Sequence, residues 1–410
     1  MKHIYTSVDI GSDSIKVVVC ELFQNKINLL AASSFKSKGI KKGLITDVEL
    51  ASITIKQAIN EVENILNLKI KKVIVSVPSY LADYSIIKGS INIENDIITN
   101  DDVMKSLEAA MKTKTLNGKE MVTILPIDFK VNNSEAILDP VGKMGSSLSC
   151  RAVLVSVPKK NIYSVVGVLE NIGVEVIDIS LNNIGDLYAF KNSNFEDKIA
   201  AIINIGSEVT SVSIYNKNVV VKSSILNMGG KNIDNDIAYM YKIDESEANQ
   251  IKTKFAVAHT AHASSQDLYE IKTSNGAMKI NQYEVSEIVM SRLEEILNLA
   301  KNELNNLTSK QIDYIIITGG VINTAYFEYL AQEVFPSKVN LGVIKIPGIR
   351  NCKYSACIGN IVYFINKLKL KGKDFTMIND DEIEDMISSS SNRNAPEAML
   401  GKIFGYFFNE

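Results

Sequence analysis

The sequence predicts an α/β fold of two duplicated core domains, with an α+β module inserted in the first half and an amphipathic helix at the C-terminus. Residues 8–19 read VDIGSDSIKVVV and residues 203–214 read INIGSEVTSVSI. Each is an apolar strand, a Gly-Ser-acid turn and a second apolar strand, and each continues through a polar turn into a third strand. Such hairpins, repeated within one chain, indicate an internal duplication. The segment 84–161 interrupts the first unit with a pattern of its own.

The composition is that of a folded protein with more than one domain. The chain has 410 residues, of which 46% are hydrophobic and 22% charged, and this is more than one typical domain needs. The net charge of −3 gives no basic surface for nucleic acid, so we expect no nucleic-acid partner. No stretch approaches the roughly eighteen apolar residues of a membrane span. The four cysteines form no CxxC pair and fit a reducing cytoplasm, and His259 and His262 are expected in an exposed loop.

The first unit continues with a helix and a buried strand. Asp47 is expected to cap a helix whose apolar residues recur at helical spacing as far as Leu66. KKVIVSVPS at 71–79 then reads as a buried strand. The insertion has its own expected elements, which are a helix after Thr99, strands at 121–131 and 147–157, and a helix near 160–172. It contains no glycine-rich loop, which favours a module for packing or interaction.

The second unit is followed by helices and one more strand. A long amphipathic helix is expected from about Tyr283 to Leu307. QIDYIIITGGVINTAYFEYLA reads as a strand, a Gly-Gly turn and a helix, and KYSACIGNIVYFINKL as a further helix. Past Lys371 the periodicity stops, and the acidic and Ser-rich sequence that follows indicates a linker.

Three glycine turns occur in one order, DIGSDS at 9–14, NIGSEV at 204–209 and TGGV at 318–321. Tight glycine turns let the main chain approach phosphate groups, and successive N–H groups form an anion-binding nest. Mg²⁺ prefers oxygen ligands. The candidate contacts in the first turn are Gly11 for the turn itself, Ser12, Asp13 and Ser14 for N–H donors, Lys16 for positive charge and Asp9 for Mg²⁺ through water. One such loop alone would equally suit a plain hairpin, whereas three favour a nucleotide site.

This arrangement resembles the actin-like ATPase superfamily, which includes actin, Hsp70 chaperones and sugar kinases. The resemblance implies ATP and Mg²⁺ as cofactors, with ITGGVIN as the adenosine-binding turn. The implied nucleotide contacts in the second half are Asn204, Gly206, Ser207, Gly229, Gly230, Gly319 and Gly320, with Glu247 and Lys252 toward the ribose and base. Asn204 stands where an Asp is usual, and Asn182 is the candidate for orienting the attacking water where Gln is often seen. We therefore expect ATP binding with weak or absent hydrolysis.

A closer resemblance covers essentially the whole chain. GIKKGLITDVE, VIVSVPS before an inserted module, and GIRNCKYSACIGNI near the end look like the bacterial cell-division protein FtsA family. The domains that this resemblance implies are core domain 1A at 1–83, 162–190 and 341–370, interaction module 1C at 84–161, core domain 2A at 191–227 and 313–340, subdomain 2B at 228–312, a disordered linker at 371–395 and a membrane-targeting helix at 396–410.

The C-terminal stretch NAPEAMLGKIFGYFFNE segregates large apolar side chains on one half of a helical wheel, as interfacial membrane helices do. These side chains are Met399, Leu400, Ile403, Phe404, Phe407 and Phe408. Each contributes roughly 1.5–3 kcal/mol when buried. Docking on the chain's own core is the alternative, and the long spacer disfavours it. Lys402 is the one basic residue from 397 to 410, so a single tail should bind weakly and a row of tails strongly.

The sequence therefore predicts an ATP-binding scaffold that polymerises through module 1C and the core. By the resemblance it tethers the tubulin-like protein FtsZ to the cytoplasmic face of the cell membrane at the division site. FtsZ's C-terminal peptide is expected on subdomain 2B, with Arg292 and Lys301 as candidate contacts. A type IV pilus assembly ATPase-like protein shares the inserted module but usually lacks the terminal helix. A sugar or acetate kinase would need a carboxylate near the second loop, and an Hsp70-type chaperone a further domain.

Overall fold

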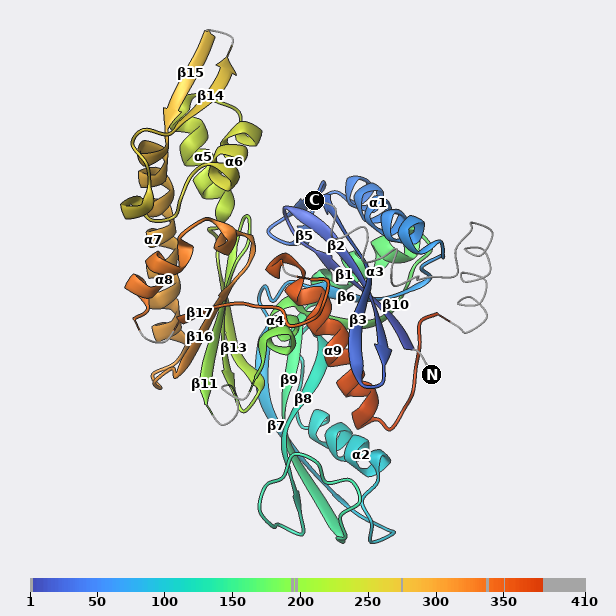
Figure 1. Ribbon diagram of the computed structural model, residues 1–410. Coiled ribbons are helices and arrows are strands. Elements are labelled where there is room, and N and C mark those ends of the chain that lie inside the picture. The colour runs from blue at the N-terminus through green and yellow to red at the C-terminus, as the bar shows by residue number, and fades with distance from the viewer. Residues whose placement is uncertain are drawn as a thin grey trace. The chain divides into compact units, whose positions relative to one another are not determined.

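The computed structural model describes residues 3–192, 195, 198–273, 276–336, 339–349 and 351–378. The expected helix at 396–410 lies outside the described residues. The chain divides into two compact units, residues 1–191 with 344–410 and residues 192–343 (Figure 1). The first unit therefore resumes later than the expected position 341, because Leu341 ends a strand of the second unit's sheet.

The first unit is built on a five-stranded sheet with the order β10-β6-β1-β2-β3. Strand β1 pairs antiparallel with β2 and parallel with β6, and β6 pairs parallel with β10. Helix α1 packs on one face of this sheet and α9 on the other (Figure 1). The core elements are β1 (His3–Ile10), β2 (Ser14–Phe23), β3 (Lys26–Lys36), β4 (Ile40–Lys41), β5 (Leu44–Ile45), α1 (Val48–Leu66), β6 (Lys72–Val77), α3 (Lys159–Asn171), β10 (Glu175–Leu181), α4 (Asn182–Phe190), η4 (Cys352–Tyr354) and α9 (Ser355–Leu370).

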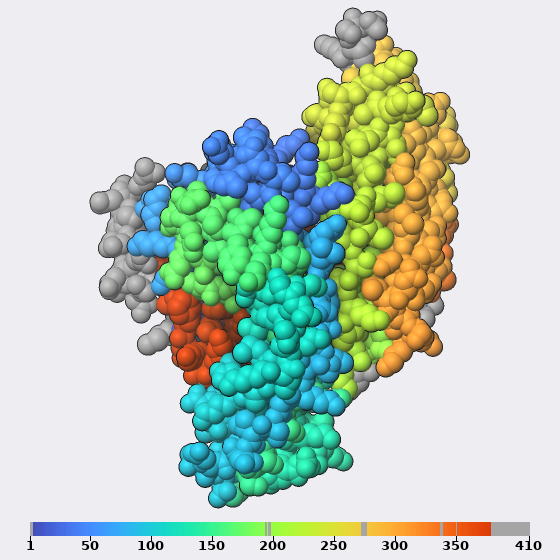
Figure 2. Space-filling model, turned by 180° about the vertical axis from the view of Figure 1, so that it is seen from behind, coloured from blue at the N-terminus to red at the C-terminus, as the bar shows by residue number. Residues whose placement is uncertain are grey.

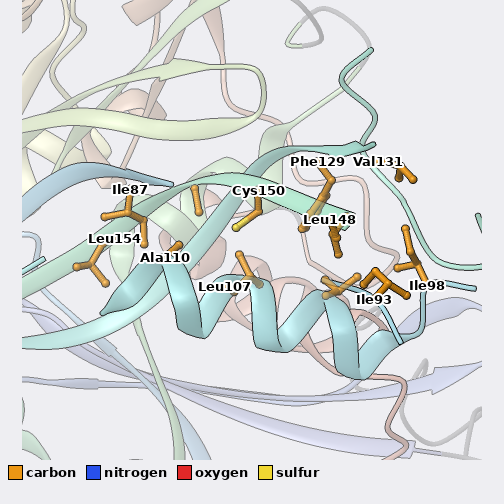
Figure 3. Close-up of a cluster of buried hydrophobic side chains, with 12 residues drawn as sticks. Ile87, Ile93, Ile98, Leu107, Ala110, Phe129, Val131, Leu148, Cys150 and Leu154 are labelled. Carbon is orange, nitrogen blue, oxygen red and sulfur yellow. The ribbon is translucent and has the colours of Figure 1, made fainter. Parts of the chain in front are cut away.

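The inserted module is a small α+β layer. Its elements are β7 (Asp83–Asn92), α2 (Asn100–Met111), β8 (Lys119–Val131) and β9 (Ser147–Pro158), with the sheet order β7-β9-β8. Thr99 caps α2 through a reciprocal capping box with Asp102. Figure 3 shows how apolar side chains of α2, such as Leu107, meet Phe129 and Leu148 from the sheet. The module therefore has a buried core of its own.

The second unit repeats the architecture of the first. Its five-stranded sheet has the order β13-β12-β11-β16-β17, in which β11 pairs antiparallel with β12 and parallel with β16. These relations match those of β1 with β2 and β6, and the expected duplication is confirmed. The elements are β11 (Ile199–Ile205), β12 (Thr210–Asn216), β13 (Val219–Leu226), α5 (Gly230–Tyr241), α6 (Glu245–Lys254), η2 (Thr260–His262), β14 (Leu268–Thr273), β15 (Gly276–Asn281), α7 (Gln282–Leu307), β16 (Tyr314–Thr318), η3 (Gly320–Asn323), α8 (Phe327–Val334) and β17 (Val339–Leu341).

The expected linker at 371–395 begins with an ordered segment, which corrects the prediction for its first residues. Residues 373–378, here called the strap, lie along the start of β1. The Met377 N–H donates to the Ile4 carbonyl at 3.0 Å, and the Met377 and Ile378 side chains are buried. Strand β6 pairs with β1 only from Ser7 onward. The earlier residues of β1 are thus open on that side, and the apolar strap fills the edge.

Candidate functional site

The first glycine turn joins β1 to β2 and is held by hydrogen bonds to the loops that follow β3. The Gly11 N–H donates to the Ser14 carbonyl at 3.2 Å, and the Gly43 N–H donates to Ser12 Oγ at 2.7 Å. Ser37 holds the turn from the other side through the carbonyls of Gly11 and Asp13. Within the described chain, the backbone N–H groups of Ser12 and Asp13 have no backbone acceptor. The turn therefore presents N–H donors of the kind that bind phosphate.

Asp9 and Lys16 form an ion pair beneath this turn. Lys16 Nζ lies 3.1 Å from Asp9 Oδ2, and the two side chains are only 12% and 15% exposed. Burial acts to lower the pKa of Lys16, but the charge and hydrogen bond of Asp9 outweigh it and the pKa is raised. A Cβ at Gly11 would lie 2.8 Å from Lys16 Nζ. Glycine at this position thus lets the ammonium approach the turn, where it stays charged.

Lys353 is a residue near this turn that the sequence analysis did not single out. It lies in η4, at the start of α9, and burial and the neighbouring charge of Lys16 lower its pKa. Two cations close together favour an anion between them. The thiol of Cys357, one turn further along, lies 3.5 Å from the Lys16 carbonyl, and burial raises its pKa well above the usual range. The motif that holds Lys353, GIRNCKYSACIGNI, supported the family resemblance, but nothing local links it to Lys16.

Asn182 is the first residue of α4 and directly follows β10. Strands β1, β6 and β10 are parallel, so their carboxyl ends meet at one edge of the sheet. Asn182 and the first glycine turn therefore lie at the same edge, with β6 between their strands. Asn182 Oδ1 accepts the Asn183 N–H at 2.9 Å, and the Asn182 side chain is half-buried. The placement agrees with the expected role, which stays a prediction.

The second glycine turn repeats the geometry of the first. The Gly206 N–H donates to the Val209 carbonyl at 3.0 Å, as Gly11 does to Ser14. Asn204 stands two residues before Gly206, where Asp9 stands before Gly11, and its register partners on β12 and β16 are Ser211 and Thr318. An amide therefore occupies the place of the carboxylate.

The glycines expected in the second half converge on one place. The Gly230 N–H donates to the Gly206 carbonyl at 2.9 Å, and a Cβ at Gly229 would lie 2.5 Å from that same oxygen. Gly319, with φ +104, approaches the Asn204 side chain, whose Oδ1 would lie 2.9 Å from a Cβ there. Only glycine allows these backbone approaches. By contrast, a Cβ at Gly320 would meet no atom within 4 Å, so its surroundings are open.

Lys252 joins this cluster through a buried ion pair. Lys252 Nζ lies 2.7 Å from Asp234 Oδ1 and donates to the Gly230 carbonyl at 3.1 Å. The ammonium is therefore already engaged beneath the glycine turns. Glu247 lies on the same helix, α6, and is bonded to the hydroxyl of Tyr269, whose pKa burial and then this carboxylate raise. The contacts expected from Glu247 and Lys252 to a ribose and base stay predictions.

The two cations expected to contact a peptide on subdomain 2B are both partnered within the chain. Arg292 on α7 forms a bidentate pair with Asp236 on α5, at 2.6 and 3.0 Å, and also bonds Glu295. Lys301 Nζ donates to the Val334 carbonyl at 2.9 Å. Arg292 is half-buried and Lys301 is exposed. An acidic partner would have to add to these contacts or displace them.

The membrane residues expected at 399–408 lie outside the described residues. In the part of the chain that the structure describes, no helix is long and apolar enough to cross a membrane. The same part contains no group of three or more His, Cys, Asp or Glu side chains that could hold a metal ion. Asp9 is thus a single carboxylate, which fits a cation shared with substrate phosphates rather than an all-protein cage.

Two family models match this chain, the model of cell division protein FtsA over residues 201–359 and that of the SHS2 domain inserted in FtsA over residues 84–156. Cell division protein FtsA of Streptococcus pneumoniae serotype 2 is 30% identical, over 86% of this chain and 78% of its own. Cell division protein FtsA of Bacillus subtilis is 25% identical, over 95% of this chain and 90% of its own.

Solved structures show the same fold at low identity. The PilM-PilN type IV pilus biogenesis complex matches with a TM-score of 0.59 and 12% identity, over 88% of this chain and 98% of that chain. MreB5 of Spiroplasma citri bound to ADP matches with a TM-score of 0.55 and 13% identity, over 90% and 98%. Together with the duplicated sheets these matches show the actin-like fold. With that fold, both family models and relatives along most of its length, the chain belongs to the family of cell division protein FtsA.

Proposed function

We propose that this member of the family is an ATP-binding scaffold that polymerises and tethers FtsZ to the cytoplasmic face of the cell membrane. The observation that carries the nucleotide part is the pair of equivalent glycine turns. Each has the same internal N–H bond, from Gly11 to Ser14 and from Gly206 to Val209. The first adds the buried Lys16, and the second gathers Gly229, Gly230 and Gly319 around it. MreB5, a relative in fold, has been solved with ADP.

Residues of the first turn would supply the charge for triphosphate and Mg²⁺. The ammonium of Lys16 and the N–H groups of Ser12 and Asp13 would face phosphate oxygens. Asp9 would hold Mg²⁺ through water, and the metal would neutralise phosphate charge when bound. Asn182 would orient a water molecule. The neutral amide of Asn204 adds no second carboxylate, which favours binding over hydrolysis.

Gly320→Val tests the adenosine turn without disturbing the fold. The new side chain enters open space, so the melting temperature should stay within about 2 °C of wild type. If the adenosine occupies that space, calorimetric titration should show at least a tenfold loss of ATP affinity, about 1.4 kcal/mol. Gly167→Val on α3 is the matched control, because a Cβ there also meets nothing within 4 Å. Unchanged ATP affinity in Gly320→Val would remove the turn from the nucleotide site.

The membrane part is tested by co-sedimentation with liposomes in the presence of ATP. We compare the intact chain with one that ends after Asn394, which lacks the apolar stretch and keeps the strap. The intact chain should pellet with liposomes, more steeply as its concentration rises, because an assembled row of tails binds with avidity. Equal pelleting of both chains would contradict membrane attachment through the tail.

The FtsZ part needs a variant that moves charge and keeps the fold. Arg292→Asp alone would place three carboxylates together with Asp236 and Glu295. The exchange Arg292→Asp with Asp236→Arg keeps an ion pair and moves the guanidinium from α7 to α5. Binding of a labelled FtsZ C-terminal peptide should fall at least tenfold, about 1.4 kcal/mol, while the melting temperature changes little. An unaltered peptide affinity in the exchanged protein would exclude Arg292 as a contact.

Self-association is supported by exposed apolar side chains on the inserted module, whose surface is drawn in cyan to green in Figure 2. Leu138 and Met144 are each 75% exposed, and Ile97, bridged to Met144, is 51% exposed. Groups of exposed apolar side chains commonly mark interfaces. Leu138→Asp with Met144→Asp should lower ATP-dependent polymer mass in pelleting assays and leave ATP affinity unchanged. Normal polymer in that variant would place self-association elsewhere.

A further inference from the structure

Four rings gather on the second unit, away from its glycine turns in sequence and unused by the functions proposed above. This ring cluster consists of His259 and His262 at η2 and Tyr326 and Tyr329 at the start of α8. The His262 ring stacks on Tyr326 with centroids 4.3 Å apart and an angle of 6° between planes. Tyr329 lies 4.5 Å from His262 and 6.0 Å from Tyr326. The rings thus form one continuous aromatic surface.

The backbone holds the two loops of the cluster together. The Ala258 N–H donates to the Ala325 carbonyl at 2.8 Å, next to a parallel bridge between Val257 and Ala325. Tyr326 adopts the left-handed conformation, with φ +63, which L-residues other than Gly, Asn and Asp rarely use. Strain of this kind persists where the surroundings fix it and is a pointer to function. Here it places the Tyr326 ring flat against His262.

His259 fixes a carboxylate beside the rings. Its Nδ1 accepts the Ala261 N–H at 3.2 Å, so the ring proton is on Nε2, which donates to Glu333 Oε1 at 3.0 Å. Glu333 remains 59% exposed. Helix α8 also carries Glu328, which is exposed, and no basic residue. The charged groups on the face of this helix are therefore carboxylates.

We propose that the ring cluster is a docking surface for an arginine side chain on a basic segment of a protein partner. Tyr326 and Tyr329 are 45% and 52% exposed, so their faces are accessible while their backs are packed. A guanidinium is planar, stacks on aromatic rings and forks to a carboxylate. Tyrosine surrounded by such contacts is a common energetic centre of interfaces. Glu328 and Glu333 would repel phosphate, which disfavours nucleic acid or an acidic lipid as the occupant.

The test uses the full chain labelled with 3-fluorotyrosine and three peptides that differ only in two positions, occupied by arginine, lysine or glutamate. Fluorine NMR reports each tyrosine, and Tyr326→Phe and Tyr329→Phe assign the two signals. The arginine peptide should shift both signals saturably at millimolar concentration, and the lysine peptide should bind at least about fivefold more weakly. The glutamate peptide should shift neither. The signal of Tyr239, 87% exposed on α5, serves as the internal control.

Tyr326→Gly separates docking from folding. Glycine relieves the left-handed strain, so this variant should melt no lower than wild type, yet the arginine peptide should no longer shift the Tyr329 signal. Retained binding in Tyr326→Gly would overturn the proposal. Equal shifts with the arginine and glutamate peptides, or no saturable shift with arginine, would overturn it as well. The ATP and liposome assays do not involve these residues, so their results are independent of this one.

Discussion

Replacing Lys252 tests whether this lysine supports the glycine turns or contacts the nucleotide. Its ammonium lies 2.7 Å from Asp234 and is bonded to the Gly230 carbonyl, and the two side chains are only 9% and 7% exposed. Lys252→Met would keep the aliphatic volume and leave the Asp234 carboxylate buried without its counterion. The structure therefore predicts a large loss of stability from a substitution that removes one charge.

The size of the loss follows from the burial of the pair. Removing one partner of a buried ion pair destabilises by about 3–5 kcal/mol. In a unit of this size each kcal/mol lowers the melting temperature by about 2–4 °C, so Lys252→Met should melt roughly 10 °C below wild type. Lys254→Met is the matched control, because Lys254 lies on the same helix, α6, and is exposed. It should melt within about 2 °C of wild type.

The double variant Lys252→Met with Asp234→Leu should recover most of the stability, because it removes both buried charges. Asn249 Nδ2 donates to Asp234 Oδ2 at 3.1 Å, and losing that acceptor should leave a deficit of about 1 kcal/mol. ATP affinity in this variant then separates the two roles. A supporting role predicts affinity within about threefold of wild type, whereas a direct contact predicts a loss of tenfold or more.

Thermal melting followed by circular dichroism, together with calorimetric titration of ATP, measures both quantities. The reasoning fails if Lys252→Met melts as high as Lys254→Met, because the carboxylate would then have another source of compensation. It also fails if the double variant melts as low as the single one. In that case the loss would come from packing and not from the unpaired charge.

Three further outcomes are expected. Burial raises the pKa of the Cys20 thiol to about 12 from 9.0; this stabilisation is complete below pH 9 and lost toward pH 12, so urea melts should show a smaller alkaline loss in Cys20→Ala. Gly359→Ala should abolish a cooperative melt, because its Cβ would overlap the α4 backbone, whereas Gly167→Ala should raise the melting temperature slightly. By calorimetry, a chain ending after Gly372 should melt about 5–10 °C below one ending after Ile378, because it lacks the buried part of the strap.

Local signals in the sequence predicted most helices and the duplicated hairpins. Asp47 caps α1 by accepting the Leu50 N–H at 3.0 Å, and the long helix expected from about Tyr283 to Leu307 is α7 (Gln282–Leu307). These features depend on residues three or four apart, where capping and periodicity are visible in the sequence. The turns themselves were also predicted, because glycine is required wherever backbones approach this closely.

The features that sequence reasoning missed depend on partners far apart in the chain. The strap at 373–378 pairs with residues at the opposite end of the chain, and its apolar side chains were read as part of a linker because the helical periodicity had stopped. Arg292 seemed available on an exposed helix face, yet its partner Asp236 lies on α5. Lys353 approaches Lys16 only because α9 packs against β1. Each needed the folded sheet before the contact could be seen.

The two halves share strand order but differ in chemistry at two equivalent positions. Asp9 faces Lys16 in register across β1 and β2, whereas Asn204 faces Ser211 across β11 and β12. An ion pair in one half thus corresponds to an amide and a hydroxyl in the other. Changing Asp9 alone would leave the buried Lys16 without a counterion, which is destabilising, so the neutral pair is coherent only with both positions exchanged. The first half therefore retains the charged pair that phosphate and a divalent cation need, and the second provides backbone N–H groups and space without added charge.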